Sequence, residues 1–284
     1  MTTLGLRQPL DVAPRDRILD VYASFVRAIG GWLAVSDLIA LLDALGVDEQ
    51  ATRSATSRMK RGGLLQAEKV EGQAGYCLSP TALAILQDGD KRIFRREDHD
   101  DAGGWVIALF SVPEAQRSQR YQIRSRLERL GFGQDQTGSW FAPAAVLAET
   151  RRELLRNDLT GFVTLWVGSH QGFGDLRQVV AQSWDLAGIA QAYRGYLAVA
   201  DQIDRHWSGE DTPGLQSAWV DYLDNLASWR SLPYQDPGLP PAVAPQDWPA
   251  AEARRRFLAL DDTLKPLAAQ VFTTSIQGLA SSPR

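Results

Sequence analysis

Apolar residues recur at helical spacing in three stretches near the start of the chain. The pattern predicts helices over residues 15–29, 36–45 and about 49–61. Ser36 and Asp48 are candidate N-terminal caps, and Gly46 lies in the short turn between the second and third helices. A two-stranded hairpin follows, and then a short helix over about residues 80–86. Helix, helix, helix and hairpin is the order of a winged helix-turn-helix.

Strand and helix patterns alternate in the middle of the chain. Strands are expected over residues 105–112, 139–142 and 161–167, with helices over residues 114–130 and 144–156. This βαβαβ order predicts a small α/β sandwich. The charged stretch before it, residues 88–104, is expected to be a solvated linker. It carries four basic residues that could also touch phosphates, namely Lys91, Arg92, Arg95 and Arg96.

The rest of the chain, from about residue 175, is predicted to be mainly helical. An apolar seam at helical spacing predicts a helix–helix contact along Ile189, Tyr193, Tyr196, Ala200, Ile203 and Trp207. Six prolines predict a loop over residues 233–249, and a last helix over about 250–277 should be kinked or divided at Pro266. We therefore expect three domains, at residues 1–90, 104–174 and 175–284, with residues 91–103 as a linker.

Composition narrows the class of protein. The chain has 284 residues, of which 44% are hydrophobic, as is ordinary for a multidomain globular protein. A single cysteine, Cys77, excludes a disulfide framework and a zinc site built from cysteines. No apolar run is long enough to cross a membrane, and the first residues lack the apolar core of a signal peptide. We expect a cytoplasmic protein that does not bind membranes.

The helix predicted over residues 49–61 has two distinct faces. Ala51, Ala55 and Met59 form an apolar face of small residues that can pack closely on other helices. The opposite face carries side chains suited to base edges and phosphates, which are Gln50, Arg53, Ser57, Lys60 and, at its edge, Arg61. The chain has a net charge of −4, yet residues 50–69 hold five basic residues and one acidic residue. A DNA-reading helix is expected, although a solvated arginine-rich face would give the same pattern.

Longer motifs extend in order over nearly the whole chain. They include Gly31-Trp32-Leu33, Leu45-Gly46-Val47, Arg61-Gly62-Gly63-Leu64-Leu65, Trp105-Val106-Ile107-Ala108, Leu130-Gly131-Phe132-Gly133, Trp140-Phe141-Ala142-Pro143, Asp236-Pro237-Gly238-Leu239-Pro240 and Trp248-Pro249. Together they resemble the PaaX family, which represses phenylacetate-catabolism operons and their relatives. The resemblance implies a homodimeric repressor that binds an inverted repeat in double-stranded operator DNA. It also implies an aryl-acyl-CoA effector, phenylacetyl-CoA in the type member, and no bound cofactor.

The winged helix-turn-helix implied by the resemblance adds three residues to the candidate DNA-binding site. Arg58 lies on the reading helix, and Lys69 and Gln73 lie in the hairpin that would form the wing. Members of the family often have a basic residue after a wing glycine, but here Gly72 is followed by Gln73 and preceded by Glu71. A weaker phosphate contact by the wing is therefore expected. The last motif also differs from that of the family, because this sequence has Trp248-Pro249-Ala250 where the family usually has Trp-Pro-Gly.

Enzymatic functions receive no support from the sequence. The middle segment resembles the ferredoxin-like fold of Cas2 nucleases, which hold a divalent metal on an aspartate after the first strand. Ser111 stands near that position, and a neutral hydroxyl cannot replace a carboxylate as a ligand of a hard cation. His99, His170 and His206 lie far apart without metal-ligand spacing, and no nucleophile elbow, P-loop or dinucleotide motif occurs. The segment is expected to serve as a dimerisation or spacing module.

Two groups of residues are candidates for the effector site. Arg117, Arg120 and Arg124 share one helix face, where they could hold CoA phosphates, contact the DNA backbone or be solvated. Trp229, Arg230 and Tyr234 form the second group. Eight of the nine tryptophans lie after residue 100, either as core residues or partly as the lining of an apolar pocket. The acidic pair Asp261-Asp262 is expected to lie on a solvated helix face.

Two hypotheses of different class follow from the sequence. The first is a ligand-responsive DNA-binding repressor. The second is an acyl-CoA or aromatic-ligand binding protein that uses its winged helix for protein contacts, which the weak wing favours. DNA binding at low salt separates the two.

Overall fold

The computed structural model describes residues 7–94, 104–209 and 213–280. Their contacts divide the chain into two compact units. The first unit combines residues 1–95 with residues 195–230 and 252–284, and the second combines residues 96–194 with residues 231–251. Helices near the end of the chain thus contribute to the first unit, and the proline-rich loop belongs to the second. The three-domain division remains a prediction.

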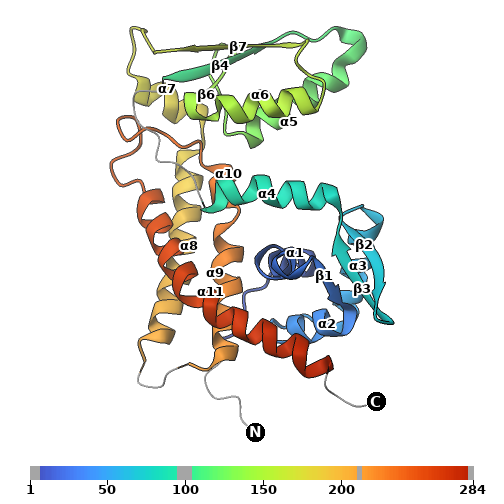
Figure 1. The fold of residues 1–284 in the computed structure, drawn as a ribbon. Helices are drawn as coiled ribbons and strands as arrows, with labels where there is room; N and C mark the ends of the chain where they lie inside the picture. Colours follow the sequence, from blue (N-terminus) through green and yellow to red (C-terminus); the bar gives the residue numbers. More distant parts are fainter. Residues whose placement is uncertain (1–6, 95–103, 210–212, 281–284) are drawn as a thin grey trace. The chain divides into compact units, whose positions relative to one another are not determined.

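The first unit begins with short helices and a small antiparallel sheet. Its elements are α1 (Pro14–Ser24), a 3-10 turn (Val26–Ile29), β1 (Trp32–Ala34), α2 (Val35–Asp43), α3 (Glu49–Arg61), β2 (Leu65–Val70), β3 (Gln73–Leu78) and α4 (Pro80–Phe94). The sheet order is β1-β3-β2, and β2 and β3 form a hairpin next to α3 (Figure 1). The expected order of three helices and a hairpin is therefore present.

Several boundaries differ from the sequence prediction. The first helix ends at Ser24 rather than residue 29, and the last turn before the glycines is a 3-10 turn. The short strand β1 was not predicted, because its three residues are recognisable only by their pairing with β3. Ser36 is not the cap of α2, since the helix begins at Val35 and the Ser36 hydroxyl donates to Asp37.

Helix α4 is longer than predicted and replaces the start of the expected linker. It continues to Phe94 instead of ending at residue 86, so Lys91 and Arg92 are helical. Two hydrogen bonds from Arg27 to the Asp90 carboxylate, at 2.7 and 2.9 Å, fasten this extension to the rest of the unit. The remainder of the expected linker, residues 95–103, lies outside the described residues.

Late helices supply much of the core of the first unit. They are α9 (Leu215–Trp229), α11 (Ala250–Ala280) and the end of α8 (Leu186–Trp207). The Phe25 ring after α1 contacts Trp219 and Tyr222 of α9 and Phe272 of α11, with ring centroids 5.3–5.4 Å apart. The Trp219 indole donates to the Leu41 carbonyl at 3.0 Å. The N-terminal helices therefore share one core with α9 and α11.

The predicted seam of α8 is buried, whereas the predicted division of the last helix is wrong. Tyr193, Tyr196 and Ile203 are each at most 2% exposed. Helix α11 continues through Pro266, because Leu264 and Ala268 on either side are fully buried and hold the helix in place. The proline removes one backbone donor without ending the helix.

The second unit is a four-stranded antiparallel sheet with helices on both faces. Its elements are β4 (Trp105–Phe110), α5 (Arg117–Arg129), β5 (Gly133–Gln134), β6 (Trp140–Pro143), α6 (Leu147–Arg156), β7 (Val163–Gly168), α7 (Leu176–Ser183) and α10 (Leu232–Gln235). The sheet order is β5-β6-β4-β7, which gives the βαββαβ arrangement of a ferredoxin-like sandwich. The predicted βαβαβ order missed β5, because a two-residue strand has no periodicity.

The first four residues of strand β4 are covered on both faces of the sheet, which explains their continuous apolar run. Val106 and Ala108 face α5 and α6, which lie together on one side of the sheet (Figure 1). Trp105 and Ile107 face the other side, where Val180 of α7 and residues of the proline-rich loop cover them. Among the described residues, no helix is both long and apolar enough to span a bilayer.

Candidate nucleic-acid interface and ligand cavities

Helix α3 is fixed at its start and along one face. The Asp48 carboxylate accepts a hydrogen bond from the Ala51 amide at 2.7 Å, so Asp48 caps the helix as predicted. Ala55 and Met59 are buried, as expected, at 0% and 2% exposure. Thr52 and Thr56 are buried as well, which the sequence did not reveal, because their residue type suggests solvent. The Thr56 hydroxyl donates to backbone carbonyls of its own helix, which satisfies its polarity.

The opposite face of α3 is exposed along its whole length. The exposed residues are Gln50, Arg53, Ser57, Arg58, Lys60 and Arg61, all of which were predicted to contact DNA. Arg53 donates to Glu49 and Arg58 to Ser54, each at 2.7 Å, within the same helix. Because both pairs are exposed, neither holds its arginine strongly. These guanidinium groups are available to an external partner.

Charge is unevenly distributed along α3. Asp48 and Glu49 lie at its start, and Arg58, Lys60 and Arg61 lie in its last turn. Acids at the N-terminus and bases at the C-terminus both stabilise a helix through its dipole. The same arrangement concentrates positive charge at the end of α3 that leads into the hairpin. An anionic partner such as a phosphate backbone would be attracted to that end.

The hairpin turns tightly at its tip. Glu71 and Gly72 form the two-residue turn, with φ of 51° and 84°, and Val70 pairs with Gln73. Lys69 and Gln73 are exposed on either side of the turn, where the sequence placed its last two DNA-binding candidates. The Glu71 carboxylate is exposed between them. One cation and one acid therefore share the tip.

The two groups of residues predicted to bind the effector differ in their exposure and in whether they line a cavity. Arg117, Arg120 and Arg124 are all exposed on α5, and the latter two line a cavity of about 390 Å³. Trp229 is only 2% exposed and its ring stacks on Phe257 with centroids 4.8 Å apart. Among the described residues, Trp229 is therefore held in the core of the first unit and lines neither described cavity.

The other two members of the second group have different surroundings. Arg230 lies near the carboxylates of Asp20 and Asp16, at 3.0 and 3.4 Å. Tyr234 lies on α10 in the second unit and is 39% exposed. The sequence grouped these residues by proximity in the chain, but they belong to two different units.

A buried ionic network joins the N-terminal segment to α9. Asp224 is fully buried and accepts hydrogen bonds from Arg7, Arg17 and the Leu10 amide. Asp221 is also buried, and it accepts hydrogen bonds from the Arg7 guanidinium at 2.9 Å and from the Trp207 indole. Its Oδ2 atom lies 2.8 Å from Nδ1 of His206. Sequence analysis missed this network, because its partners lie some 200 residues apart in the chain. Its two carboxylates therefore have structural partners within the protein.

Burial also corrects one prediction about acidic residues. Asp261 is 8% exposed, and burial raises its carboxyl pKa, so it does not lie on a solvated helix face. Asp262 beside it is exposed, as predicted. His170 is exposed in a loop. No cluster of three or more metal-ligating side chains occurs within the described ranges.

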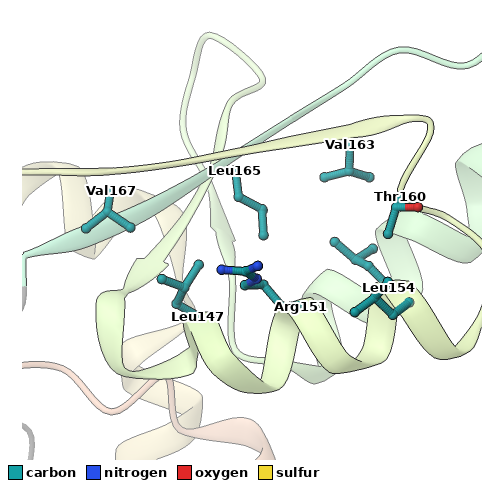
Figure 2. A pocket seen from close by; sticks show the side chains of 8 residues that line it. Leu147, Arg151, Leu154, Thr160, Val163, Leu165 and Val167 are labelled. Atoms are coloured by element: carbon teal, nitrogen blue, oxygen red, sulfur yellow. The ribbon is translucent and has the colours of Figure 1, made fainter.

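An apolar groove lies between α6 and β7. It encloses about 360 Å³ and is lined by Leu147, Arg151, Leu154, Leu155, Thr160, Val163, Leu165 and Val167. Figure 2 shows alternate residues of β7 facing the apolar side of α6, with Arg151 between them. Val167 and Leu155 are more than half exposed, so the groove is open to solvent. Its one charged residue is a cation.

Comparisons with known proteins cover almost the whole chain. Three family models match in order along the chain. The model described as PaaX-like protein matches residues 13–82, and the model described as PaaX protein central Cas2-like domain matches residues 98–180. The model described as PaaX-like protein C-terminal domain matches residues 184–274. The transcriptional repressor PaaX of Escherichia coli (strain K12) is 23% identical over 257 residues, which cover 88% of this chain and 80% of that protein.

One solved structure has the same fold. It is an uncharacterised protein from Mycobacterium tuberculosis, with a TM-score of 0.60 and 21% sequence identity. The alignment covers 92% of this chain and 99% of that chain. The similarity therefore extends over both units.

Proposed function

Because the chain belongs to the PaaX family of transcriptional repressors, we propose that it is a ligand-responsive, DNA-binding regulator acting in the cytoplasm. A member of this family is a regulator rather than an enzyme. The observation that carries the proposal is the exposed basic face of α3, opposite a face packed into the unit. In this proposal α1, α2 and α3 with the β2–β3 hairpin act as a winged helix-turn-helix, and α3 enters the major groove.

Each exposed residue of α3 has a role in this arrangement. Gln50 and Arg53 can form paired hydrogen bonds to adenine and guanine edges, which is how side chains read sequence. Arg58, Lys60 and Arg61 lie toward the basic end of the helix, where they would hold the phosphate backbone and fix orientation. Lys69 adds one cation from the hairpin, and the Glu71 carboxylate limits the contribution of the wing.

We extend the proposal to the regulated genes and the effector by analogy with the family. We propose repression of an aromatic-acid operon of the phenylacetate type, with release by an aryl-acyl-CoA thioester. The regulator would bind an inverted repeat as a homodimer, each protomer placing one α3 in a major groove. The thioester can release DNA only if it binds one dimer geometry more tightly than the other. The relative named as a transcriptional repressor supports this reading.

A mobility-shift assay with the full-length protein tests the proposal. The probe is DNA from upstream of the protein's own operon, and a shuffled fragment of equal length is the control. We expect a shift of the upstream fragment at nanomolar to micromolar protein, abolished by one member of a panel of CoA thioesters. Failure to shift any upstream fragment at low salt, together with retained thioester binding, would instead support a ligand-binding protein that uses the same unit for protein contacts.

A further inference from the structure

A second cavity lies in the central sheet of the second unit, at the end of β4. It has a volume of about 390 Å³ and is bounded by the end of β4, by α5 and by the loop that leads into β6. The side chains on its wall that carry hydrogen-bond donors are Ser111, Arg120, Arg124, Gln134, Thr137, Ser139 and Trp140. All of them belong to the same unit. The cavity is therefore defined by one body of the protein.

The wall of this cavity is positively charged. It contains two arginines and no carboxylate. The Arg120 guanidinium donates one hydrogen bond to the Val112 carbonyl at 3.0 Å, which anchors it at the end of β4 and leaves other N–H groups for a ligand. Arg126 and Arg129 of the same helix lie 3.3 and 3.1 Å from the Glu153 carboxylate. Arg124 has no ion-pair partner among the described residues, and its charge is available at the cavity.

A buried donor without an acceptor also lines the cavity. Trp140 is 5% exposed, and its indole N–H finds no hydrogen-bond partner within the described part of the chain. Buried N–H groups usually have a hydrogen-bond partner. The Trp140 Nε1 atom is itself buried, so a ligand in the open cavity does not reach it. The inference therefore rests on the cavity and its two arginines.

A carboxylate in the loop next to the cavity already has hydrogen-bond partners. Asp135 Oδ1 accepts hydrogen bonds from the Thr137 amide, the Thr137 hydroxyl and the Ser139 amide, at 2.7–2.9 Å. Asp135 is not part of the cavity wall. Its charge organises the loop, and the Thr137 hydroxyl donates to Asp135 and lies 3.0 Å from the Ser139 hydroxyl. The donors that the cavity offers to a ligand are therefore chiefly the guanidinium groups of Arg120 and Arg124.

We propose that this cavity binds a phosphate group of a small ligand of the nucleotide or coenzyme A class. Guanidinium groups and hydroxyls are the preferred donors for phosphate oxygens. A concave site of this size suits a small molecule, whereas contacts to a DNA backbone need no enclosed cavity. The inference deepens the proposed function and rests on it for the ligand, which would be the phosphate-bearing end of the effector. Arg117, outside the cavity wall, takes no part.

Calorimetric titration of the full-length protein tests the site. The probes are coenzyme A, adenosine 3′,5′-bisphosphate and, as a control without phosphate, adenosine. We expect the phosphorylated probes to bind and adenosine not to bind. Arg124→Gln should weaken binding roughly tenfold or more, because a charged hydrogen bond is lost. Trp140→Phe, which keeps the ring and removes the buried N–H, should leave probe binding unchanged.

Matched controls separate the site from general charge and from the DNA-binding function. Arg117→Gln removes an equal charge from the same helix outside the cavity and should leave probe binding unchanged. The stronger of the two phosphorylated probes identifies the source as a thioester-type ligand or a free nucleotide. Equal effects of Arg117→Gln and Arg124→Gln, or loss of affinity for random duplex DNA in Arg124→Gln alone, would overturn the inference.

DNA-binding measurements on the same proteins distinguish the proposed phosphate site from the proposed function. Arg124→Gln should bind upstream DNA as tightly as the wild type in the absence of ligand. If the wild type binds no upstream DNA, the proposed function fails while calorimetry still decides the phosphate site. If DNA is bound and no phosphorylated probe is, the phosphate site fails and the proposed regulator remains.

Discussion

In the proposed function, Arg53 is the residue on which direct reading of DNA depends most. Its ion pair with Glu49 is exposed on both sides, with side chains 58% and 61% accessible. Pairs of this kind contribute little to stability, so DNA can replace Glu49 as the partner at small cost. The planar guanidinium then fits the two acceptors of a guanine edge. The structure thus leaves the side chain exposed on a rigid helix.

Replacing Arg53 by Ala should reduce operator affinity by about 1–3 kcal/mol and relax preference at one base pair, because a paired contact to a base is lost. Fluorescence anisotropy at fixed salt measures both effects. Lys91→Ala is the matched control, because it removes one exposed positive charge from α4 in the same unit. Equal losses for the two variants would mean that Arg53 contributes only general charge.

Asp20 is a buried carboxyl next to the ionic network. Burial raises its pKa to about 7, against the opposing charges of Arg230 and Arg17. An unfolded chain has an ordinary aspartate pKa near 4. Above pH 4 the unfolded state therefore releases a proton that the folded state still holds. The contribution of Asp20 to stability is fully present below about pH 4, falls as pH rises to about 7 and is constant above that value.

The variant Asp20→Asn should remove this pH dependence. We expect wild-type stability relative to the variant to fall by on the order of 2–4 kcal/mol between pH 4 and pH 8. Urea denaturation at several pH values measures the difference in the free energy of unfolding between the wild type and the variant. The readout is how this difference changes with pH, because its absolute size also reflects other effects of the substitution. Parallel stability curves for the two proteins would show that Asp20 titrates normally.

At the residue scale, the sequence predicted exposure better than role. The helical wheel correctly placed Ala55 and Met59 inward and Arg53 and Lys60 outward, because a capped helix with one apolar face has one way to pack. The sequence left Trp229 open between the core and an effector group and placed Asp261 on a solvated face, whereas both are buried by elements far away in the chain. An aromatic or acidic residue carries no local signal of that kind.

At the scale of elements, α3 was predicted with its observed limits. Its start is fixed by the Asp48 cap and its end by Gly62, both of which are local signals. The strands β1 and β5 were missed, since they are short and exist only through pairing with distant strands. Gly75 of β3 shows how strand β1 depends on its pairing with a distant strand. A β-carbon there would lie 2.4 Å from the Trp32 ring, so the pairing with β1 requires a glycine.

The capping of α3 gives a prediction at the scale of the helix. Asp48→Ala should destabilise the protein by about 1 kcal/mol, because the Ala51 amide loses its acceptor. The melting temperature should fall by roughly 2–4 °C for a unit of this size. Asp48→Asn keeps an oxygen that can cap the helix and should restore most of the loss. Differential scanning fluorimetry measures both, and an unchanged melting temperature for the alanine variant would contradict the role of the cap.

At the scale of the whole molecule, charge and topology act together. The chain is acidic on average, with a net charge of −4, while the region of α3 and the hairpin is basic. DNA should therefore be attracted to one surface and repelled elsewhere, which favours a single docking orientation. The helices α9 and α11 share the core of the unit that carries this surface. Sequence patterns predicted the last helix and a mainly helical region that includes α9, but not where these helices pack, since packing between distant segments leaves no periodic signal.

The assembly proposed for DNA binding is also open to measurement. A two-fold dimer should have twice the mass of the 31.3 kDa chain by light scattering. Footprinting should then show two protected half-sites separated by roughly 34–36 Å, or a multiple of it, along the DNA. Monomers that protect a single half-site would contradict the dimeric arrangement while leaving DNA reading by α3 intact.

The central claim is that this protein reads DNA sequence through α3. The most direct test is the ratio of affinities for its upstream DNA and for shuffled DNA, by fluorescence anisotropy at one physiological salt concentration. The account predicts a ratio of about 10³ or more, falling steeply in Arg53→Ala. Equal affinities for the two DNA molecules, unchanged by that substitution, would contradict it.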